Sequence, residues 1–212
     1  MLATAYARVG IAVLAVAWGS AAVAQYGVSY RVVEVFLLAS AAVAGSAYAV
    51  TARLALLGSE DATHALVNDT LRHLALPLLA LGTAVAAGAQ LLPLALGDRY
   101  GPAVATTRVL ACALPPMFVN GLLTAHLYGR GRYHTVLRIA FANLLVNGVL
   151  IALLVAPYGA PGVAFAVVAT ESVNTALQSR AAGLSYRAWS WTIGGVSFLG
   201  GALTFLLALH AR

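Results

Sequence analysis

The chain has 212 residues, of which 62% are hydrophobic and 8% are charged. A soluble domain carries about 25% charged residues, so this composition excludes an ordinary soluble fold and indicates an integral membrane protein. The formal net charge of +6 comes from arginines at the ends of apolar runs. Because these arginines are dispersed and not interleaved with aromatic residues, no nucleic-acid partner is predicted.

Apolar runs separated by short polar breaks predict an all-α fold with about seven transmembrane helices, since each run is near or above the roughly 20 residues that cross a bilayer. The second run is the longest and must tilt or extend beyond the bilayer. The first run has features of a secretory signal, but more apolar sequence follows it, so we interpret it as a transmembrane helix. The predicted ranges are 3–25, 28–57, 71–97, 104–128, 134–156, 161–182 and 189–209.

Glycine and proline mark the ends and bends of these runs. Gly58 is expected to end the second helix, and Asp69 and Thr70 are suited to capping the third. Pro77 interrupts the third run, and the two prolines at 115–116 lie at the centre of the fourth. Such prolines either produce a static kink or, in a transporter, mark an interrupted helix that lines the substrate route.

Arginine positions predict the orientation, because short cytoplasmic loops of membrane proteins collect positive charge. With the N-terminus inside, seven spans place eight arginines near the cytoplasm and four outside, and the C-terminus lies outside. The turn YGRGRYHT at 128–135 falls on the cytoplasmic side, where its arginines are expected to anchor a helical hairpin without contacting substrate. The cytoplasmic set is Arg8, Arg53, Arg72, Arg130, Arg132, Arg138, Arg180 and Arg187, and the outer set is Arg31, Arg99, Arg108 and Arg212.

Glu171 is the most informative polar residue within a predicted span. It lies near the middle of the sixth run, and Asn174, Thr175 and Gln178 follow at helical spacing, which predicts one polar stripe. A charged acidic side chain at the bilayer centre costs roughly 2.5 to 3.5 kcal/mol, so the stripe must face protein or water. It either lines a cavity or forms structural hydrogen bonds to a neighbouring helix.

Other polar groups allow the same two interpretations. Asn143 and Asn147 lie one turn apart in the fifth run, about a turn after Arg138, and amides at such positions can line a cavity or join helices. Arg31 and Glu34 have the i, i+3 spacing of a helical ion pair. Two further candidates are Arg8, which can snorkel from the first span, and Asn120, which follows the prolines of the fourth.

No motif for catalysis or metal binding is present. The sequence has no GxSxG, HExxH or Walker pattern, and no single span holds two carboxylates. Cys112 is the only cysteine, and the five histidines lack the spacing of a metal site. We therefore predict no enzyme, no catalytic residue, no metal and no cofactor.

Three stretches occur in this order along the chain: YARVGIAVLAVAWGSAAVAQYGVSYRVVEVF, LGDRYGPAVATTRVLACALPP and GLLTAHLYGRGRYHTVLRIAFANLLVNGVLIALLVAPYGAPGVAFAVVATE. Together they resemble the polysaccharide flippases of the multidrug/oligosaccharidyl-lipid/polysaccharide exporter superfamily. The first is similar to the start of the second lobe of these proteins, and the second to a later stretch in which a G-x-x-Y-x-x-A segment opens a helix. The third is the clearest match, with its G-R turn, paired asparagines and P-x-G-x-x-G-x-A segment. The resemblance covers about residues 5–182.

The resemblance implies a carrier with two six-helix lobes around a cationic cavity. Residues 1–182 would form the C-terminal lobe, and 183–212 an additional transmembrane helix. Such proteins flip oligosaccharides, commonly linked to undecaprenyl diphosphate, across the bacterial inner membrane by alternating access. The expected cavity residues are Arg8, Arg31 and Arg138 for the diphosphate and acidic sugars, and Glu34, Asn120, Asn143, Asn147, Glu171 and Asn174 for pairing and sugar hydroxyls.

Two departures from the family shape these expectations. Gly10 stands where relatives often carry an acidic residue soon after the arginine of this helix, which puts ion coupling by that residue in doubt. A rocking carrier also needs two bodies. The expected partners are therefore membrane lipids, the lipid-linked glycan, and an N-terminal lobe, a second copy or another half-protein. The alternatives are a drug or cation antiporter of the same superfamily, which would need an acidic cavity, and a non-transporting subunit or truncated remnant.

Overall fold

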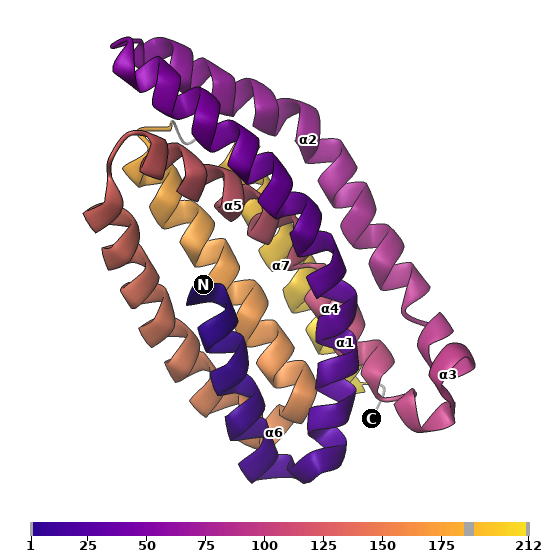
Figure 1. Cartoon of the computed structure of the whole chain (residues 1–212). Coiled ribbons are helices and arrows are strands. Elements are labelled where there is room, and N and C mark those ends of the chain that lie inside the picture. Colours follow the sequence, from indigo (N-terminus) through magenta and orange to yellow (C-terminus); the bar gives the residue numbers. More distant parts are fainter. Residues whose placement is uncertain (1, 185–188, 211–212) are drawn as a thin grey trace.

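The computed structural model describes residues 2–184 and 189–210, and the side chains from residue 9 onward within these ranges. Its described part is helical and contains no strand. Figure 1 shows the helices side by side in one elongated bundle. They are α1 (Leu2–Leu56), α2 (Glu60–Gly88), α3 (Leu91–Leu96), the 3₁₀ turn η1 (Asp98–Tyr100), α4 (Ala103–Ala111), α5 (Leu114–Gly129), α6 (Tyr133–Ala181) and α7 (Trp189–His210).

The two longest helices each reverse direction at a glycine (Figure 1). Gly19 in α1 has φ 76° and ψ −174°, and Gly159 in α6 has φ 60° and ψ −136°. Residues with a Cβ rarely adopt such backbone angles, so the glycines permit the reversals. Each helix therefore has two arms, which we call the first and second arms: 2–18 and 20–56 in α1, and 133–158 and 160–181 in α6.

The reversal in α1 corrects the boundary predicted between 25 and 28. Residues 25–28 lie within the second arm of α1, and the chain turns at Gly19 instead. Tyr26 is fully buried in that arm, so the polar residues around it belong to a packed helix face. The reversal predicted between 156 and 161 does occur, at Gly159.

The polar segment before residue 71 is helical, which corrects the predicted start of the third helix. α2 begins at Glu60, so Asp69 and Thr70 lie inside the helix and do not cap it. The acidic residues Glu60 and Asp61 occupy its first turn, where they complement the helix dipole. α2 continues through Pro77 and ends at Gly88, earlier than the predicted residue 97.

The predicted interruption of the fourth run takes the form of a 42° bend between α4 and α5. The helix breaks at 112–113, and Pro115 and Pro116 fall in the first turn of α5. Proline is tolerated there because the amide groups of a first turn have no partner within the helix. The prolines therefore start a new helix and do not kink the middle of one.

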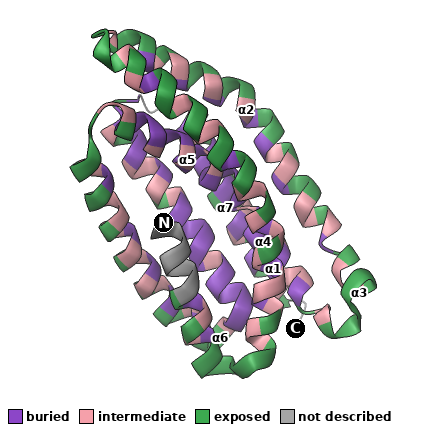
Figure 2. Ribbon diagram, viewed as in Figure 1, coloured by how far each residue is buried: buried purple, intermediate pink, exposed green. Residues whose placement is uncertain are grey.

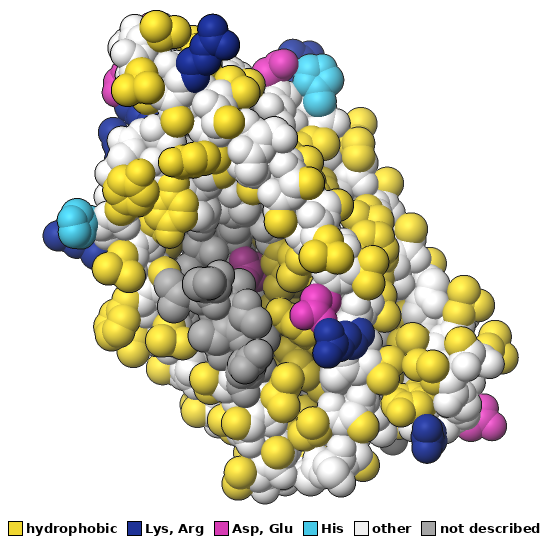
Figure 3. Space-filling model, in the orientation of Figure 1, with side chains coloured by type: hydrophobic (Ala, Val, Ile, Leu, Met, Phe, Trp, Pro, Cys, Tyr) yellow, Lys and Arg dark blue, Asp and Glu magenta, His cyan; other side chains and the backbone are white. Residues whose placement is uncertain are grey.

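The chain has the architecture of a helical membrane protein. Four helices are long and apolar enough to cross a membrane, and the bent pair α4–α5 makes a fifth candidate. At most 28% of the residues in the most apolar stretches of the four helices are buried inside the bundle. Figure 3 shows hydrophobic side chains over much of one face, with charged groups at its ends and a few near its middle. Such a surface suits lipid and not water.

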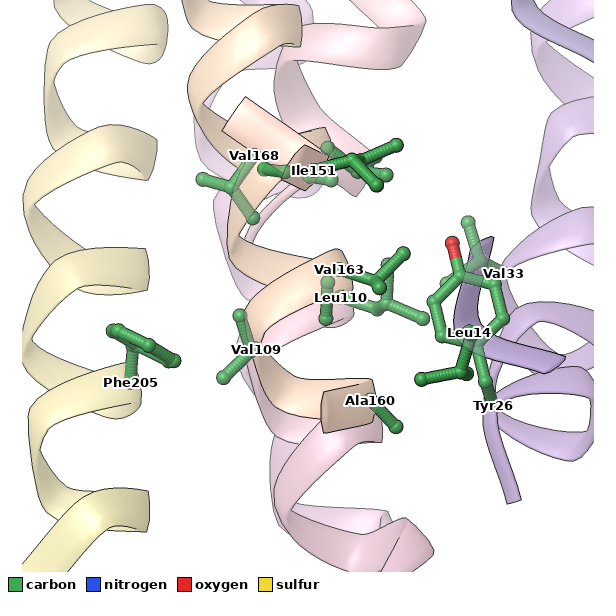
Figure 4. Close-up of a cluster of buried hydrophobic side chains, with 14 of the residues drawn as sticks. Leu14, Tyr26, Val33, Val109, Leu110, Ile151, Ala160, Val163, Val168 and Phe205 are labelled. Atoms are coloured by element: carbon green, nitrogen blue, oxygen red, sulfur yellow. The ribbon is translucent and has the colours of Figure 1, made fainter. Parts of the chain in front are cut away.

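The core lies around α4, α5 and the second arm of α6. Almost every residue from Gly159 to Glu171 is buried, and the outer helices expose one side (Figure 2). Leu14 and Tyr26 of α1 meet Val163 of α6 in this core, as Figure 4 shows. α7 packs closely on α6 because glycine at position 201 brings its backbone near Val168.

Candidate functional site

A cavity of about 420 Å³ lies between the second arm of α1, α5 and both arms of α6. Its lining combines apolar side chains with a carboxyl group, four amides, a threonine and a tyrosine. A cavity of this size is within the range of small-molecule sites, which are mostly apolar with a few convergent polar groups. The lining residues are Leu37, Ala44, Met117, Asn120, Gly121, Thr124, Tyr128, Val136, Ile139, Ala140, Asn143, Glu171, Asn174 and Gln178.

Glu171 is held on one wall of the cavity by α5. The Asn120 amide donates to the Glu171 carboxylate at 2.6 Å and to its backbone carbonyl at 3.0 Å. Thr175 in turn donates to the Asn120 carbonyl oxygen at 2.8 Å. Glu171 and Asn120 are only 2% and 5% exposed. The carboxyl group is therefore stabilised in the bundle by one amide donor on a neighbouring helix.

The hydrogen-bonded network continues along the polar stripe of α6. Asn174, which also lines the cavity, accepts a hydrogen bond from the Gln178 amide at 2.8 Å. Thr124 of α5 donates to the Gln178 carbonyl oxygen at 3.0 Å. The structure thus places the stripe between α5 and the cavity, so its groups both join two helices and line a cavity.

The first arm of α6 forms another wall of the cavity. Asn143 lines it and is 3% exposed, and its carbonyl oxygen has no hydrogen-bond partner among the described residues. Asn147, one turn further, donates to the Thr170 hydroxyl at 3.1 Å and does not line the cavity. Asn143 is therefore part of the cavity wall, whereas Asn147 joins the two arms of α6.

The arginines expected in the cavity lie elsewhere where the structure describes them. Arg31 pairs with Glu34 at 2.6 Å, as the i, i+3 spacing predicts, and both side chains are on the exposed side of α1. Arg138 is exposed, and it does not line the cavity. The side chain of Arg8 lies outside the described part of the chain. Among the described lining residues, Glu171 is the one charged group.

Sequence reasoning missed two polar lining residues of α5, Thr124 and Tyr128. They follow Asn120 at i+4 and i+8, so helical spacing from that asparagine could have identified both. The orientation of the arginines has no comparable signal. A helical arginine can point toward a cavity, toward lipid or toward the interface, depending on how the helix is rotated in the bundle.

The chemistry of the cavity is that of binding. Carboxyl and amide groups donate and accept hydrogen bonds with hydroxyl and ammonium groups. In the described residues, no three histidine, cysteine or acidic side chains come together in a metal-ligating group. The chain matches no known protein family, no curated protein and no solved structure. The functional interpretation therefore rests on the fold and on this cavity.

Proposed function

We propose that the chain is one lobe of a membrane carrier that flips a lipid-linked oligosaccharide, with the sugar in the polar cavity. The cavity is the observation that carries this proposal. Glu171 lies about ten residues from the end of its arm, hence about 15 Å inside the bundle. An ionisable group at that depth is costly and indicates a function. The family resemblance supports the same class of carrier.

The proposed topology has seven passages through the membrane. Counting the arms of α1 and α6 separately, and α4 with α5 as one, gives seven successive helical segments. Six glycines with positive φ lie where the chain turns between them. Figure 1 places three turns at each end of the bundle. These glycines are Gly19, Gly58, Gly97, Gly131, Gly159 and Gly183.

The proposed location is the bacterial inner membrane, with the N-terminus in the cytoplasm and the C-terminus outside. The end of the bundle at Gly58, Gly131 and Gly183 carries more arginines than the opposite end, which suits the cytoplasmic face. Tyr128 and Tyr133 lie at the cytoplasmic end, and Trp18 and Tyr158 next to turns at the other. Aromatic residues at both ends are typical of membrane interfaces.

The substrate assignment follows from the groups in the cavity. Carboxyl and amide groups suit sugar hydroxyls, which both donate and accept hydrogen bonds. Arg31 and Arg138 do not line this cavity, so we assign them no contact with a diphosphate there. Alternating access needs a second body that closes on the cavity. That body is an N-terminal lobe, a second copy or another half-protein.

A cation antiporter is the second candidate, and one observation favours it. Glu171 places a carboxyl group in the described wall of the cavity. A carboxylate attracts cations, so it could bind the cation that an antiporter carries. The two candidates share the site but differ in the substrate that it binds.

Reconstitution of the full chain in liposomes separates the two candidates. The vesicles contain a fluorescent undecaprenyl-diphosphate oligosaccharide, and added lectin measures how much sugar reaches the outer leaflet. We expect Glu171→Gln to slow this transfer about tenfold, because a hydrogen-bonded charged group contributes roughly 1.5 to 3 kcal/mol. Glu34→Gln is the matched control, since Glu34 lies outside the cavity.

A parallel measurement tests cation transport with ethidium release driven by a proton or sodium gradient. Release that is lost in Glu171→Gln and kept in Glu34→Gln, without lipid transfer, would replace the flippase by the antiporter. Absence of both activities would contradict both candidates for the chain acting alone. Co-reconstitution with a six-span partner protein would then test the half-transporter.

A further inference from the structure

A second pocket, of about 330 Å³, lies at the end of the bundle where α1 leads to α2 and α5 leads to α6. None of its lining residues lines the polar cavity, so the two sites are distinct. Two short connections that are far apart in sequence form the pocket. Its lining consists of Ala55, Gly58, Glu60, Thr63, Arg130 and Arg132.

The two arginines of the pocket are held in place by their neighbours. Arg130 is largely buried, with 8% of its side chain exposed, and it pairs with the Glu60 carboxylate. Its guanidinium also bonds to Nε2 of His64 at 2.9 Å. Because arginine only donates, Nε2 is the acceptor in this contact. Arg132 donates to the Ala181 carbonyl at 2.6 Å, which fixes it against the end of α6.

The charge balance of the pocket is positive. Two guanidiniums face one carboxylate, and that carboxylate is 75% exposed. Each guanidinium has five N–H groups, and the structure uses only some of them for Glu60, His64 and Ala181. The remaining donors can bind the oxygens of a phosphate, whose geometry matches the planar fork of arginine.

The position of the pocket identifies the source of the phosphate. Tyr128 and Tyr133 flank the same α5–α6 turn and stack with ring centroids 5.4 Å apart. Their side chains are 38% and 55% exposed. Half-exposed tyrosines beside arginines at the end of a bundle are typical of the headgroup region of a membrane. Basic pockets between transmembrane helices at this level bind anionic headgroups.

We infer that the pocket formed by Arg130 and Arg132 binds the phosphate of an anionic phospholipid. The lipid phosphate competes with Glu60 for Arg130 and takes the free donors of Arg132, while the acyl chains follow the apolar outer faces of the helices. The site goes beyond the proposed transport function and does not depend on it. A lipid bound there contacts both the α1–α2 and the α5–α6 connections, so occupancy of the site depends on the lipid composition of one leaflet.

Native mass spectrometry of the full chain, released from phosphatidylcholine nanodiscs containing increasing phosphatidylglycerol, measures this binding. We expect saturable retention of phosphatidylglycerol in preference to phosphatidylcholine. Arg132→Gln should weaken it about fivefold, the contribution of one basic residue near an anionic surface. Arg138→Gln is the matched control, because Arg138 is an exposed arginine outside the pocket. It should leave retention unchanged.

Glu60→Gln provides a second variant that does not depend on folding of Arg132→Gln. Removing the competing carboxylate should strengthen retention about fivefold by the same charge argument, and unchanged or weaker retention would contradict the inference. Equal losses in Arg132→Gln and Arg138→Gln would show diffuse surface attraction and overturn it. Displacement of the lipid by an equal concentration of inorganic phosphate would assign the site to free phosphate instead.

Discussion

At the scale of single residues, Glu171 and Asn120 explain how an acidic side chain is accommodated inside an apolar bundle. The two residues are 51 positions apart and are joined by two hydrogen bonds from one amide. An acceptor left buried without its donor costs about 1 to 3 kcal/mol, more for a charged group, whereas replacing both partners by apolar groups can be nearly neutral. This asymmetry allows the pair to be tested by a double-mutant cycle.

We expect Asn120→Leu to destabilise the protein by about 1 to 3 kcal/mol, because the carboxyl group then loses its α5 donor. The double variant Asn120→Leu with Glu171→Leu should recover most of that loss. Thermal unfolding in detergent, followed by circular dichroism, measures both. If the two substitutions are additive, the stabilising coupling between these residues is absent and the site needs another explanation.

His126 presents the opposite situation, a buried polar ring without compensation. Its side chain is fully buried, and neither ring nitrogen has a hydrogen-bond partner among the described residues. Because an unsatisfied buried polar group costs about 1 to 3 kcal/mol, His126→Leu should raise stability. His64→Leu is the control, since it removes the acceptor of Arg130 and should lower stability. If His126→Leu and His64→Leu change the unfolding midpoint in the same direction, His126 is not an uncompensated buried group.

At the scale of elements, the packing of α7 on α6 depends on small residues. A Cβ at position 201 would lie 2.7 Å from the Val168 side chain, whereas a Cβ at Gly195 meets nothing within 4 Å. Gly201→Val should therefore destabilise by about 1 to 3 kcal/mol through overpacking. Gly195→Val makes the same change in helix propensity on the same helix and controls for it. Equal unfolding midpoints for the two variants would show that α7 packs differently.

Sequence reasoning recovered the elements whose ends are marked by glycine or proline and whose apolar runs are continuous. It found the end of α1 at Gly58, the bend before Pro115 and the reversal at Gly159. It missed the start of α2, because residues 60–70 are polar on the surface and bury only Thr63 and Val67. It missed Gly19 because this glycine lies among other small residues.

The candidate site was recovered in part, for a physical reason. The stripe at Glu171, Asn174 and Gln178 follows from local spacing on one helix. Its partners on α5 are set by long-range packing, which no local pattern encodes. The same applies to Arg31 and Arg138, whose place outside the cavity depends on helix rotation. Whether Asn143 contacts a substrate stays a prediction.

At the scale of the whole molecule, the proposed topology puts the connection at Ser59 and the connection at Asp98 on opposite sides of the membrane. In a Cys112→Ala background, Ser59→Cys should react with an impermeant maleimide only after the cytoplasmic side is opened. Asp98→Cys should react in intact spheroplasts. Reversed labelling would invert the orientation, and labelling of both from one side would contradict the number of passages.

The contact between the two glycine reversals gives the protein a built-in optical probe. The Trp18 indole donates to the Val155 carbonyl at 2.7 Å, and its ring covers Gly159. The chain has only three tryptophans, and the other two, Trp189 and Trp191, lie at the start of α7, at the opposite end. Iodide added outside should therefore quench the emission of Trp18 selectively. Separation of the α1 and α6 tips during transport would change its emission maximum, so movement of the lobe can be followed without any added label.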